Sequence, residues 1–440
     1  MKTERFYIEN ASKFDDQVVT IKGWVYNRRS SGKIKFLMMR DGTGLMQGVL
    51  FKGECSEEAF AEFDTLTQES SVEVTGKLRK EPRSASGYEM GVQSLKIVSV
   101  AEPYPISPKE HGVEFLMENR HLWIRSQRQW AALRVRAEII RAIGEFFDNR
   151  GFIRFDAPVL TPSSCEGTST LFSTPYFDEK AYLTQSGQLY GETGAMAFGK
   201  IYVCGPTFRA EKSKTRKHLT EFWMVEPEVA FADLEENMNL GEAFIEHIVQ
   251  SVLKNKAPEL KILERDLTKL ESIKGPFPRI SYDEALKILE KRGLPLPWGE
   301  DFGAPHETAL GEEFGKPVFV HHMPSQIKAF YFKQSDTVGG PGVEGTGKYA
   351  LGCDLIAPDG YGEIIGGGQR EESAEVLKRR IAEHGLSEAD YSWYLDLRRF
   401  GSVPHSGFGL GIERTVAWMT GVEHVRETIP YPRMLNTLRP

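Results

Sequence analysis

The first hundred residues alternate between short runs of β-branched or aromatic residues and turn-forming pairs, and a proline-rich passage ends this pattern. The runs QVVTIKGWVYNRR, KIKFLMMRDGTGLMQGVLF, SVEVTGKLRK and GYEMGVQSLKIVSVAEP are typical of strands, and Asp41-Gly42 and Gly44 mark turns. Five short strands in about 100 residues favour a small β-barrel of the oligonucleotide-binding kind. The passage EPYPISPKEHG that follows is typical of a hinge.

Beyond the hinge, the apolar residues recur at the spacing of a helix and no longer alternate as in a strand. The segment ALRVRAEIIRAIGEFFDNRG carries apolar residues at this spacing: Leu133, Ile139, Ile140, Ile143, Phe146 and Phe147. Further helices are expected over 235–256 and 372–384, with a strand at YGEIIGGGQR and a strand–turn–helix at GFGLGIERTVAWMTG. We predict an α+β protein with a barrel at 1–103, a hinge at 104–125 and a second domain at 126–440.

Composition limits the class of protein. The four cysteines are scattered without a CxxC pair, so a zinc site or a disulfide framework is not expected. No basic-then-apolar leader follows MKTER, and no run of about 18 apolar residues occurs, which predicts a cytoplasmic protein without a membrane partner. The net charge is −7, yet basic residues cluster at 22–40, 77–83 and 209–217, which indicates local phosphate contacts.

Three separated segments carry motifs: the helix and strand of 133–158, FRAEKSKTRKHLTEFWMVEPEVAF at 208–231, and GLGIER at 409–414. Each alone has an ordinary explanation, such as a surface ion pair or a closely packed helix start. In this order they resemble motifs 1, 2 and 3 of the class II aminoacyl-tRNA synthetases. Together with the barrel they resemble the aspartyl/asparaginyl/lysyl subgroup, whose N-terminal barrel binds the anticodon. The resemblance implies an antiparallel catalytic sheet flanked by helices, and a homodimer with motif 1 at its interface.

The resemblance also implies an ATP site. Attack of a carboxylate on the α-phosphate brings negative charges together, so the site has to supply positioned cations. By the resemblance, the catalytic Arg209 contacts the α-phosphate and the substrate carboxylate, and the catalytic Arg414 holds the γ-phosphate. Phe222 would lie under the adenine and Glu211 at its amino group, while His218 lies in the loop that closes over ATP. Asp354 and Glu363 would bind Mg²⁺ through oxygen, although they are spaced wider than in aspartyl relatives.

The stretch TQSGQLYGET takes the place of the subgroup's amino-acid-binding loop. The resemblance sets Ser186 and Gln188 beside the substrate ammonium group and Glu166 against it. Aspartyl members carry QSPQxxKQ here, and their lysine holds the substrate's side-chain carboxylate. This chain has Gly191-Glu192 in place of that Lys-Gln. The cation that aspartate would need is missing.

A second departure points to the same substrate. Glu226 stands where aspartyl members carry aspartate, and Arg370 ends GGGQR. A carboxamide has one acceptor oxygen and two N–H donors, so it can accept from Arg370 and donate to Glu226, whereas aspartate would bring a like charge. We therefore expect L-asparagine and the asparagine tRNA as partners, with ATP and Mg²⁺. A purely structural acid at the end of a strand is the alternative for Glu226.

In the barrel, the resemblance implies anticodon contacts for three residues. Phe36 would stack on the middle base, Gln47 would bond its edge, and Arg28 would meet phosphate. A residue of the barrel core is the alternative for Phe36.

Three other functions stay open. One is an aspartyl enzyme, including a form that also charges the asparagine tRNA. Another is a stand-alone relative that makes asparagine, although such relatives lack the barrel. The third is a catalytically silent RNA-binding paralogue, although such proteins usually lose the ATP-binding residues.

Overall fold

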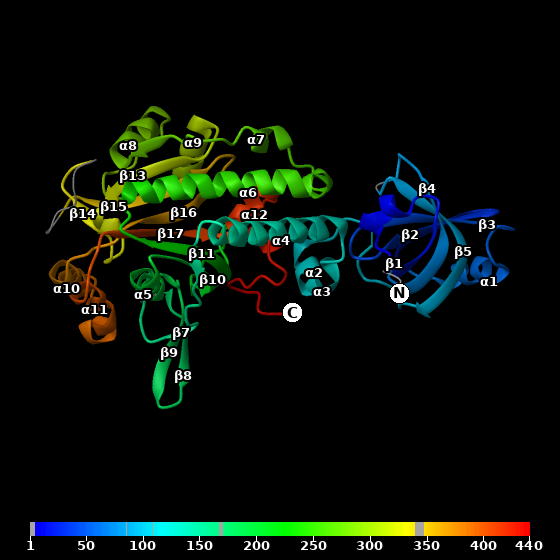
Figure 1. The fold of residues 1–440 in the computed structure, drawn as a ribbon, viewed down its shortest axis with the longest axis horizontal. Coiled ribbons are helices and arrows are strands. Elements are labelled where there is room, and N and C mark those ends of the chain that lie inside the picture. Colours follow the sequence, from blue (N-terminus) through cyan, green and yellow to red (C-terminus); the bar gives the residue numbers. More distant parts are fainter. Residues whose placement is uncertain (1–4, 85, 108, 167–169, 339–346) are drawn as a thin grey trace. The chain divides into compact units, whose positions relative to one another are not determined.

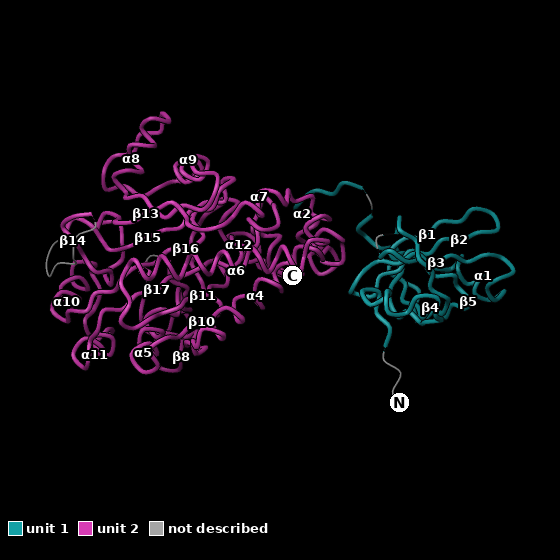
Figure 2. Tube along the Cα trace, turned by 45° about the horizontal axis from the view of Figure 1, so that its top comes forward, with its two compact units in different colours: residues 1–113 teal, residues 114–440 magenta. Residues whose placement is uncertain are grey.

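The computed structural model describes residues 5–84, 86–107, 109–166, 170–338 and 347–440. The chain forms two compact units, Met1–Val113 and Glu114–Pro440 (Figure 2). Their boundary falls inside the segment 104–125, which the sequence predicts as a hinge. Among the helices of the described residues, none is both long and apolar enough to cross a membrane.

Part of the predicted hinge is helical. Helices α2 (Val113–Glu118) and α3 (Arg120–Trp123) occupy its second half. The fully buried Arg120 anchors this segment, because its guanidinium donates to the carbonyls of Pro430 (2.8 Å) and Ile429 (2.9 Å). These partners lie 310 and 309 residues further along the chain, so a local reading of the sequence could not find them.

The first unit contains the expected five-stranded closed barrel, with strand order β1-β2-β3-β5-β4. The strands are β1 (Val18–Ser31), β2 (Ile34–Arg40), β3 (Leu45–Phe51), β4 (Ser71–Lys80) and β5 (Tyr88–Ser99), and the helix α1 is Glu57–Glu62. Successive side chains of a strand point to opposite faces of the sheet, so every second side chain points into the barrel. In β2, Leu37 and Met39 are fully buried in the core, whereas Phe36 is only partly buried, on the outward face. Phe36 is thus no member of the barrel core.

The second unit is built on a nine-stranded sheet with the path β12-β13-β15-β16-β17-β11-β10-β6 and β14 beside β15 (Figure 1). The bounds are β6 (Ile153–Arg154), β10 (Lys200–Phe208), β11 (Glu221–Ala230), β12 (Arg279–Ser281), β13 (Val318–Pro324), β14 (Gln334–Ser335), β15 (Tyr349–Ala357), β16 (Gly362–Gln369) and β17 (His405–Gly411). Pairing is antiparallel except for β12–β13 and β10–β6. A separate small sheet has the order β7-β9-β8, with β7 (Leu160–Thr161), β8 (Ser173–Tyr176) and β9 (Glu179–Leu183).

Two long helices run side by side over this sheet, α4 (Gln127–Asp148) and α6 (Leu234–Ile262) (Figure 1). Phe146, Phe147 and Phe244 pack between them with ring centroids 4.7 to 5.1 Å apart. A capping box formed by Asp233 and Glu236 starts α6. The other helices are α7 (Leu267–Glu271), α8 (Tyr282–Lys291), α9 (Ala304–Phe314), α10 (Ala374–Glu383), α11 (Ser392–Arg399) and α12 (Ile412–Thr420).

Several helices were not expected from the sequence, and one of them lies at the site. The segment that the sequence predicts as an amino-acid-binding loop is, from Gln188 onward, the start of α5 (Gln188–Phe198). This helix packs on β10 and β11. A Cβ atom on Gly191 would lie 3.3 Å from Ile201 and 3.5 Å from Glu228, so glycine allows the helix to approach the sheet closely.

Candidate active site

The site lies on the face of the sheet opposite the core of the second unit, where β11 turns alternate side chains toward it. Phe222, Met224, Glu226 and Glu228 share this face of β11, whereas Val225 is fully buried in the core. The strand β17 lies beside β11 and carries glycine at 407, 409 and 411. At position 407 a Cβ atom would overlap the carboxylate of Glu228, so only glycine fits there.

All six residues expected to bind ATP line one pocket. They are Arg209, Glu211, His218, Phe222, Glu363 and Arg414. They come from the connection between β10 and β11, from β11 and β16, and from the first turn of α12. Residues more than 200 positions apart in the sequence therefore line the same pocket.

Arg209 is the cation at the centre of this pocket. Burial lowers its pKa, but the carboxylates of Glu166, Glu211 and Glu363 outweigh that effect and raise it. The Nε atom of Arg209 is buried and has no hydrogen-bond partner among the described residues. Its guanidinium lies 5.5 Å from the centre of the Phe222 ring. A buried donor without a partner is costly, so this atom is suited to an acceptor on a ligand.

Two further basic groups face the same pocket. Arg414 donates from Nη1 to the backbone carbonyl of Glu363 (2.8 Å), which fixes its guanidinium at the pocket wall. The ring of His218 contacts the hydroxyl of Thr215. Burial, and then the charge of Arg414, lower the pKa of His218, so this ring is neutral near pH 7.

The two expected Mg²⁺ ligands lie close together despite their wide spacing, because β15 and β16 form a hairpin. A Cβ atom on Gly366 would lie 2.5 Å from Glu363 Oε1 and 3.5 Å from Asp354 Oδ1, so both carboxylates approach the same point. Burial raises the pKa of Glu363 to about 7, and the charge of Asp354 adds to the rise. Oxygen donors that lack a full set of counter-charges suit a hard cation.

Lys328 lies beside the two expected Mg²⁺ ligands. Its ammonium group lies 2.8 and 2.7 Å from the two carboxylate oxygens of Asp354. No cluster of three or more His, Cys, Asp or Glu side chains suited to a metal occurs in the described parts of the chain. The residues fit a Mg²⁺ ion that keeps water and substrate phosphate as its other ligands, with Glu363 as the main protein ligand and Asp354 partly neutralised by Lys328.

On the amino-acid side, Glu226 is nearly fully buried and joins the start of α5. Its Oε1 accepts a hydrogen bond from the Ser186 hydroxyl, and its Oε2 accepts one from the backbone N–H of Gly187 (2.8 Å). Burial raises the pKa of Glu226, and these two donors oppose the rise. Ser186 and Glu226, expected from separate motifs, therefore contact each other.

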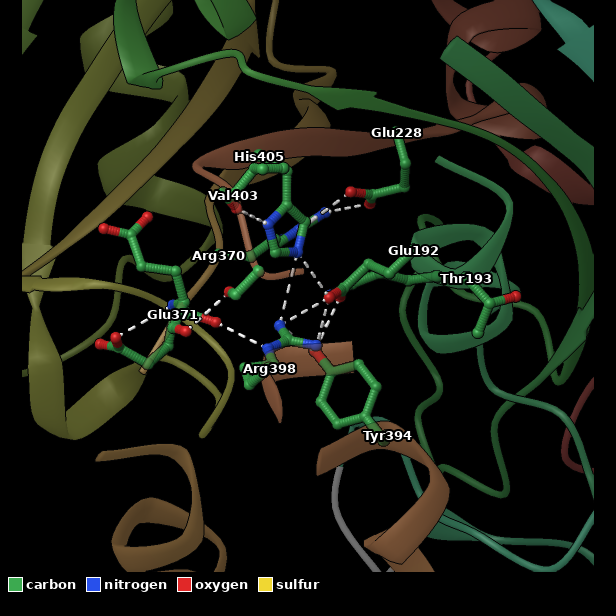
Figure 3. A network of polar contacts seen from close by, with 12 residues as sticks. Glu192, Thr193, Glu228, Arg370, Glu371, Tyr394, Arg398, Val403 and His405 are labelled. Atoms are coloured by element: carbon green, nitrogen blue, oxygen red, sulfur yellow. Dashed lines mark hydrogen bonds and ion pairs between the residues drawn. The ribbon is translucent and has the colours of Figure 1, made fainter. Parts of the chain in front are cut away.

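Arg370 meets a partner that the sequence did not suggest. The guanidinium, 1% exposed, donates from Nη2 to Glu228 Oε1 (2.5 Å) and from Nε to Oε2 (3.3 Å) (Figure 3). Burial raises the pKa of Glu228, and Arg370 opposes the rise. The hydrogen bonds from Arg370 to Glu228 use its Nε and Nη2 atoms. A Cβ atom at position 191 would lie 3.5 Å from Glu228 and 3.3 Å from Ile201, so a lysine side chain there would start in contact with both residues.

Glu166 lies at the other side of the site. The Tyr331 hydroxyl donates to its Oε1 (2.9 Å), and the ring of Tyr331 lies 5.4 Å from the Arg370 guanidinium. Gln185 holds the backbone of this segment by accepting from the N–H groups of Cys165 (3.1 Å) and Glu166 (3.0 Å). The many polar side chains of TQSGQLYGET therefore serve to fix the residues on either side of the site.

The three expected anticodon residues lie on neighbouring strands of the barrel. Arg28 on β1 is exposed, and Phe36 on β2 and Gln47 on β3 are partly exposed on the outward face. Arg29 covers the ring of Phe36 at 4.4 Å, and the side-chain amide of Gln47 donates to Glu89 (3.3 Å). An aromatic ring with flanking cations on an outer barrel face is a typical stacking surface for single-stranded nucleic acid.

Reasoning from sequence missed three polar contributors to the site: Lys328, Tyr331 and Glu228. A lysine inside the apolar-aromatic run of QIKAFYF is a detectable signal, because lysine is rarely buried without a partner. Glu228 stands two residues after Glu226 in β11, and the period of a strand could have placed both carboxylates on one face.

Comparisons with known proteins agree with this geometry. Residues 112–435 match the family of class II tRNA synthetases (D, K and N), and residues 19–98 match the OB-fold nucleic acid binding domain. The asparagine–tRNA ligase of Desulforamulus reducens is 57% identical over 98% of this chain and 99% of its own length. Asparaginyl-tRNA synthetase of Pyrococcus horikoshii, complexed with asparaginyl-adenylate, superposes with a TM-score of 0.93 at 42% identity over all of both chains. The Entamoeba histolytica enzyme, in complex with the same adenylate, gives 0.88 at 32% identity over 99% of each chain.

Proposed function

We propose, from the premise that the chain belongs to the class II tRNA synthetases of the D, K and N group, that it attaches asparagine to the asparagine tRNA in an ATP-dependent reaction. The α-carboxylate of asparagine attacks the α-phosphorus of ATP, and pyrophosphate leaves. The 3′-hydroxyl of the terminal tRNA adenosine then attacks the carbonyl carbon of the adenylate, and AMP leaves. The cytoplasmic location expected from the sequence stays a prediction.

In the first step the chain's cations oppose the charge that develops. Arg209 lines the ATP pocket and interacts electrostatically with Glu166, which supports a role in contacting both the α-phosphate and the amino-acid carboxylate. Arg414 holds the γ-phosphate, Phe222 lies under the adenine, Glu211 contacts the adenine amino group, and His218 covers the phosphates as a neutral ring. Glu363 and Asp354 would hold a Mg²⁺ ion, which would supply further positive charge to the phosphates. Positioned donors of this kind stabilise a transition state more than its ground state.

The Arg370–Glu228 pair carries the choice of amino acid. Because Glu228 already neutralises Arg370, a side-chain carboxylate would find no unbalanced cation there. The buried carboxylate of Glu226 would add repulsion. A carboxamide avoids both problems, since its oxygen accepts from Arg370 and its nitrogen donates to a carboxylate. Glu166 is left for the substrate ammonium group, with Ser186 and Gln188 beside it.

The alternatives fit less well. An aspartyl enzyme would need a second cation, and this chain has Gly191 where aspartyl members carry lysine. A stand-alone asparagine-making relative lacks the barrel that this chain has. A silent paralogue would not be expected to gather all six ATP-binding residues in one pocket.

Charging of the asparagine tRNA tests this function. The purified protein should attach labelled asparagine to that tRNA when ATP and Mg²⁺ are present, and chelation of the metal should stop the reaction. Formation of aspartyl-tRNA at an equal rate would instead support the non-discriminating aspartyl alternative.

The barrel should act on tRNA and not on adenylate formation. Phe36→Ala and Gln47→Ala should each weaken tRNA charging, since stacking of one base on an aromatic ring contributes about 1–3 kcal/mol. Pyrophosphate exchange without tRNA should not change. Phe51→Ala is the matched control, because Phe51 is also an exposed aromatic residue of the barrel (39%). A parallel fall of exchange and charging would mean that Phe36 and Gln47 are structural.

The chain should form a homodimer through the segment 133–158. Two apolar side chains of this segment are exposed, Ile140 (39%) and Ile153 (45%). Light scattering at micromolar concentration should give twice the chain mass of 49.7 kDa. Ile140→Asp should weaken the dimer, whereas Ile262→Asp, at a position of similar exposure (38%), should not. A fully active monomer at that concentration would contradict the expected assembly.

A further inference from the structure

A buried polar network lies behind Arg370 and connects three elements that are distant in sequence (Figure 3). Glu192 comes from α5, Tyr394 and Arg398 come from α11, and His405 starts β17. The side chains of Glu192, Arg398 and His405 have no exposed surface. None of these residues has a role in the function proposed above, yet they surround the residue that selects the substrate.

Glu192 is the acceptor at the centre of the network and is ionised. Its oxygens receive hydrogen bonds from Gln188 (3.1 Å), Tyr394 (2.8 Å) and Arg398 (2.7 Å), as expected for a carboxylate. Burial alone raises the pKa of Glu192, but Arg398 and then His405 lower it well below its usual range.

His405 has an acceptor at each ring nitrogen. Nδ1 lies 2.8 Å from the backbone carbonyl oxygen of Val403, and Nε2 lies 2.9 Å from Glu192 Oε2. A carbonyl oxygen and a carboxylate can only accept, so both ring nitrogens have to donate. In a neutral imidazole one ring nitrogen carries a lone pair and no proton, and this lone pair would face the oxygen of Val403 or Glu192. The contact of Nε2 with Arg398 Nη2 is longer (3.4 Å), so the Glu192 carboxylate is the nearer partner of Nε2.

We propose that His405 is held as an imidazolium and is a positioning residue for the amino-acid site. The proposal rests on the function proposed above, because Arg370 is its point of action. The backbone carbonyl of His405 accepts from the Arg370 N–H (2.9 Å), and Arg398 donates to the carbonyl of the next residue, Glu371 (2.8 Å). The residues that supply the two cations therefore also contact the backbone at Arg370 and Glu371, His405 through its own carbonyl and Arg398 through its side chain.

The charge of His405 matters because Arg370 itself attracts Glu192. With His405 and Arg398 both charged, Glu192 is neutralised, and Arg370 stays with Glu228 and the substrate. When His405 loses a proton, Arg398 alone faces Glu192, and Glu192 then pulls on Arg370. The ionisable groups that face His405 are Glu192 on α5, together with Tyr394 and Arg398 on α11. Glu228 on β11 and Glu371, which follows β16, complete the surrounding charges.

The protonation state can be read directly by nitrogen NMR of the histidine rings in the full-length protein. At pH 8, about 1.5 units above the ordinary imidazole value, exposed histidines are neutral. Among the ten histidines, one should keep protons on both ring nitrogens, and its signal should vanish in His405→Gln. If every histidine has an unprotonated nitrogen at pH 8, or if the doubly protonated one persists in His405→Gln, the proposal is wrong.

Kinetics test the positioning role. His405→Gln keeps a donor for Glu192 and removes the charge, so the KM for asparagine in pyrophosphate exchange should rise about 10-fold, the effect of one charge-assisted bond. The KM for ATP should not change, and kcat should fall by less than about threefold. His121→Gln, at an exposed position, is the matched control. An unchanged KM for asparagine in folded His405→Gln would overturn the role.

A failure of the proposed function can be distinguished from a failure of the proposal for His405. The NMR measurement on wild-type protein needs no activity, so a failure to activate asparagine would refute the function and leave the imidazolium standing. If His405→Gln does not fold, the wild-type spectrum at pH 8 still decides the protonation state, and His405→Asn supplies the assignment and the KM.

Discussion

Replacing Arg209 by alanine should lower asparagine-dependent pyrophosphate exchange by about 10²- to 10³-fold, the loss expected when one donor to a developing charge is removed. Arg209 is the cation around which Glu166, Glu211 and Glu363 gather, and its buried Nε has no partner among the described residues. A ligand phosphate or carboxylate is the natural acceptor for it. Arg209→Lys keeps the charge but not the forked geometry, so it should recover only part of the rate.

The control for this variant is Arg292→Ala. Arg292 forms surface ion pairs with Glu312 and Glu313 on α9, and such pairs contribute little to stability. Its exchange rate should equal that of the wild type. Circular dichroism and thermal melting should show that Arg209→Ala is folded. A folded Arg209→Ala protein that exchanges at the wild-type rate would refute the assignment of the ATP site.

Glu226→Gln should lower kcat/KM for asparagine about 10- to 100-fold and narrow the preference over aspartate, because one charge-assisted bond and one repulsion are lost together. The replacement fits the site. The glutamine oxygen can accept from the Gly187 N–H, and its amide can donate to the Ser186 hydroxyl, which is able to accept. The variant therefore removes the charge and leaves the two local hydrogen bonds in place.

The melting temperature of Glu226→Gln distinguishes a loss of selectivity from a loss of folded protein. Burial raises the pKa of Glu226, which means that folding works against its ionisation near pH 7. Glu226→Gln should consequently melt at or above the wild-type temperature. Glu313→Gln, at an exposed position, is the matched control and should leave both substrates unaffected. An unchanged ratio of asparagine to aspartate in Glu226→Gln would move the selectivity to Arg370 and Glu228.

Much of the fold follows from local patterns. The barrel is evident from period-two alternation and turn pairs, and α4 is evident from the helical spacing of its apolar residues. The helix α5 escaped prediction because Gly191 and Gly194 give it a low helix propensity. Its close packing on β10 and β11 needs those glycines and overrides the propensity.

The site could be predicted only as far as its motifs reach. Motif positions named the six residues of the ATP pocket and Glu226, but they did not name the partner of Arg370. Glu228 and Arg370 are 142 residues apart, and His405 lies 213 residues from Glu192. Pairs of this kind depend on the order of strands in the sheet, which is set by non-local contacts.

The central claim is that the protein selects asparagine as its amino-acid substrate. The most direct test is ATP–pyrophosphate exchange measured in parallel with asparagine, aspartate and lysine. A site that pairs polar groups with one ligand leaves them unpaired with another. We expect exchange with asparagine, kcat/KM at least about 100-fold lower with aspartate, and none above background with lysine. Equal kcat/KM for aspartate and asparagine in the wild-type protein would contradict the account.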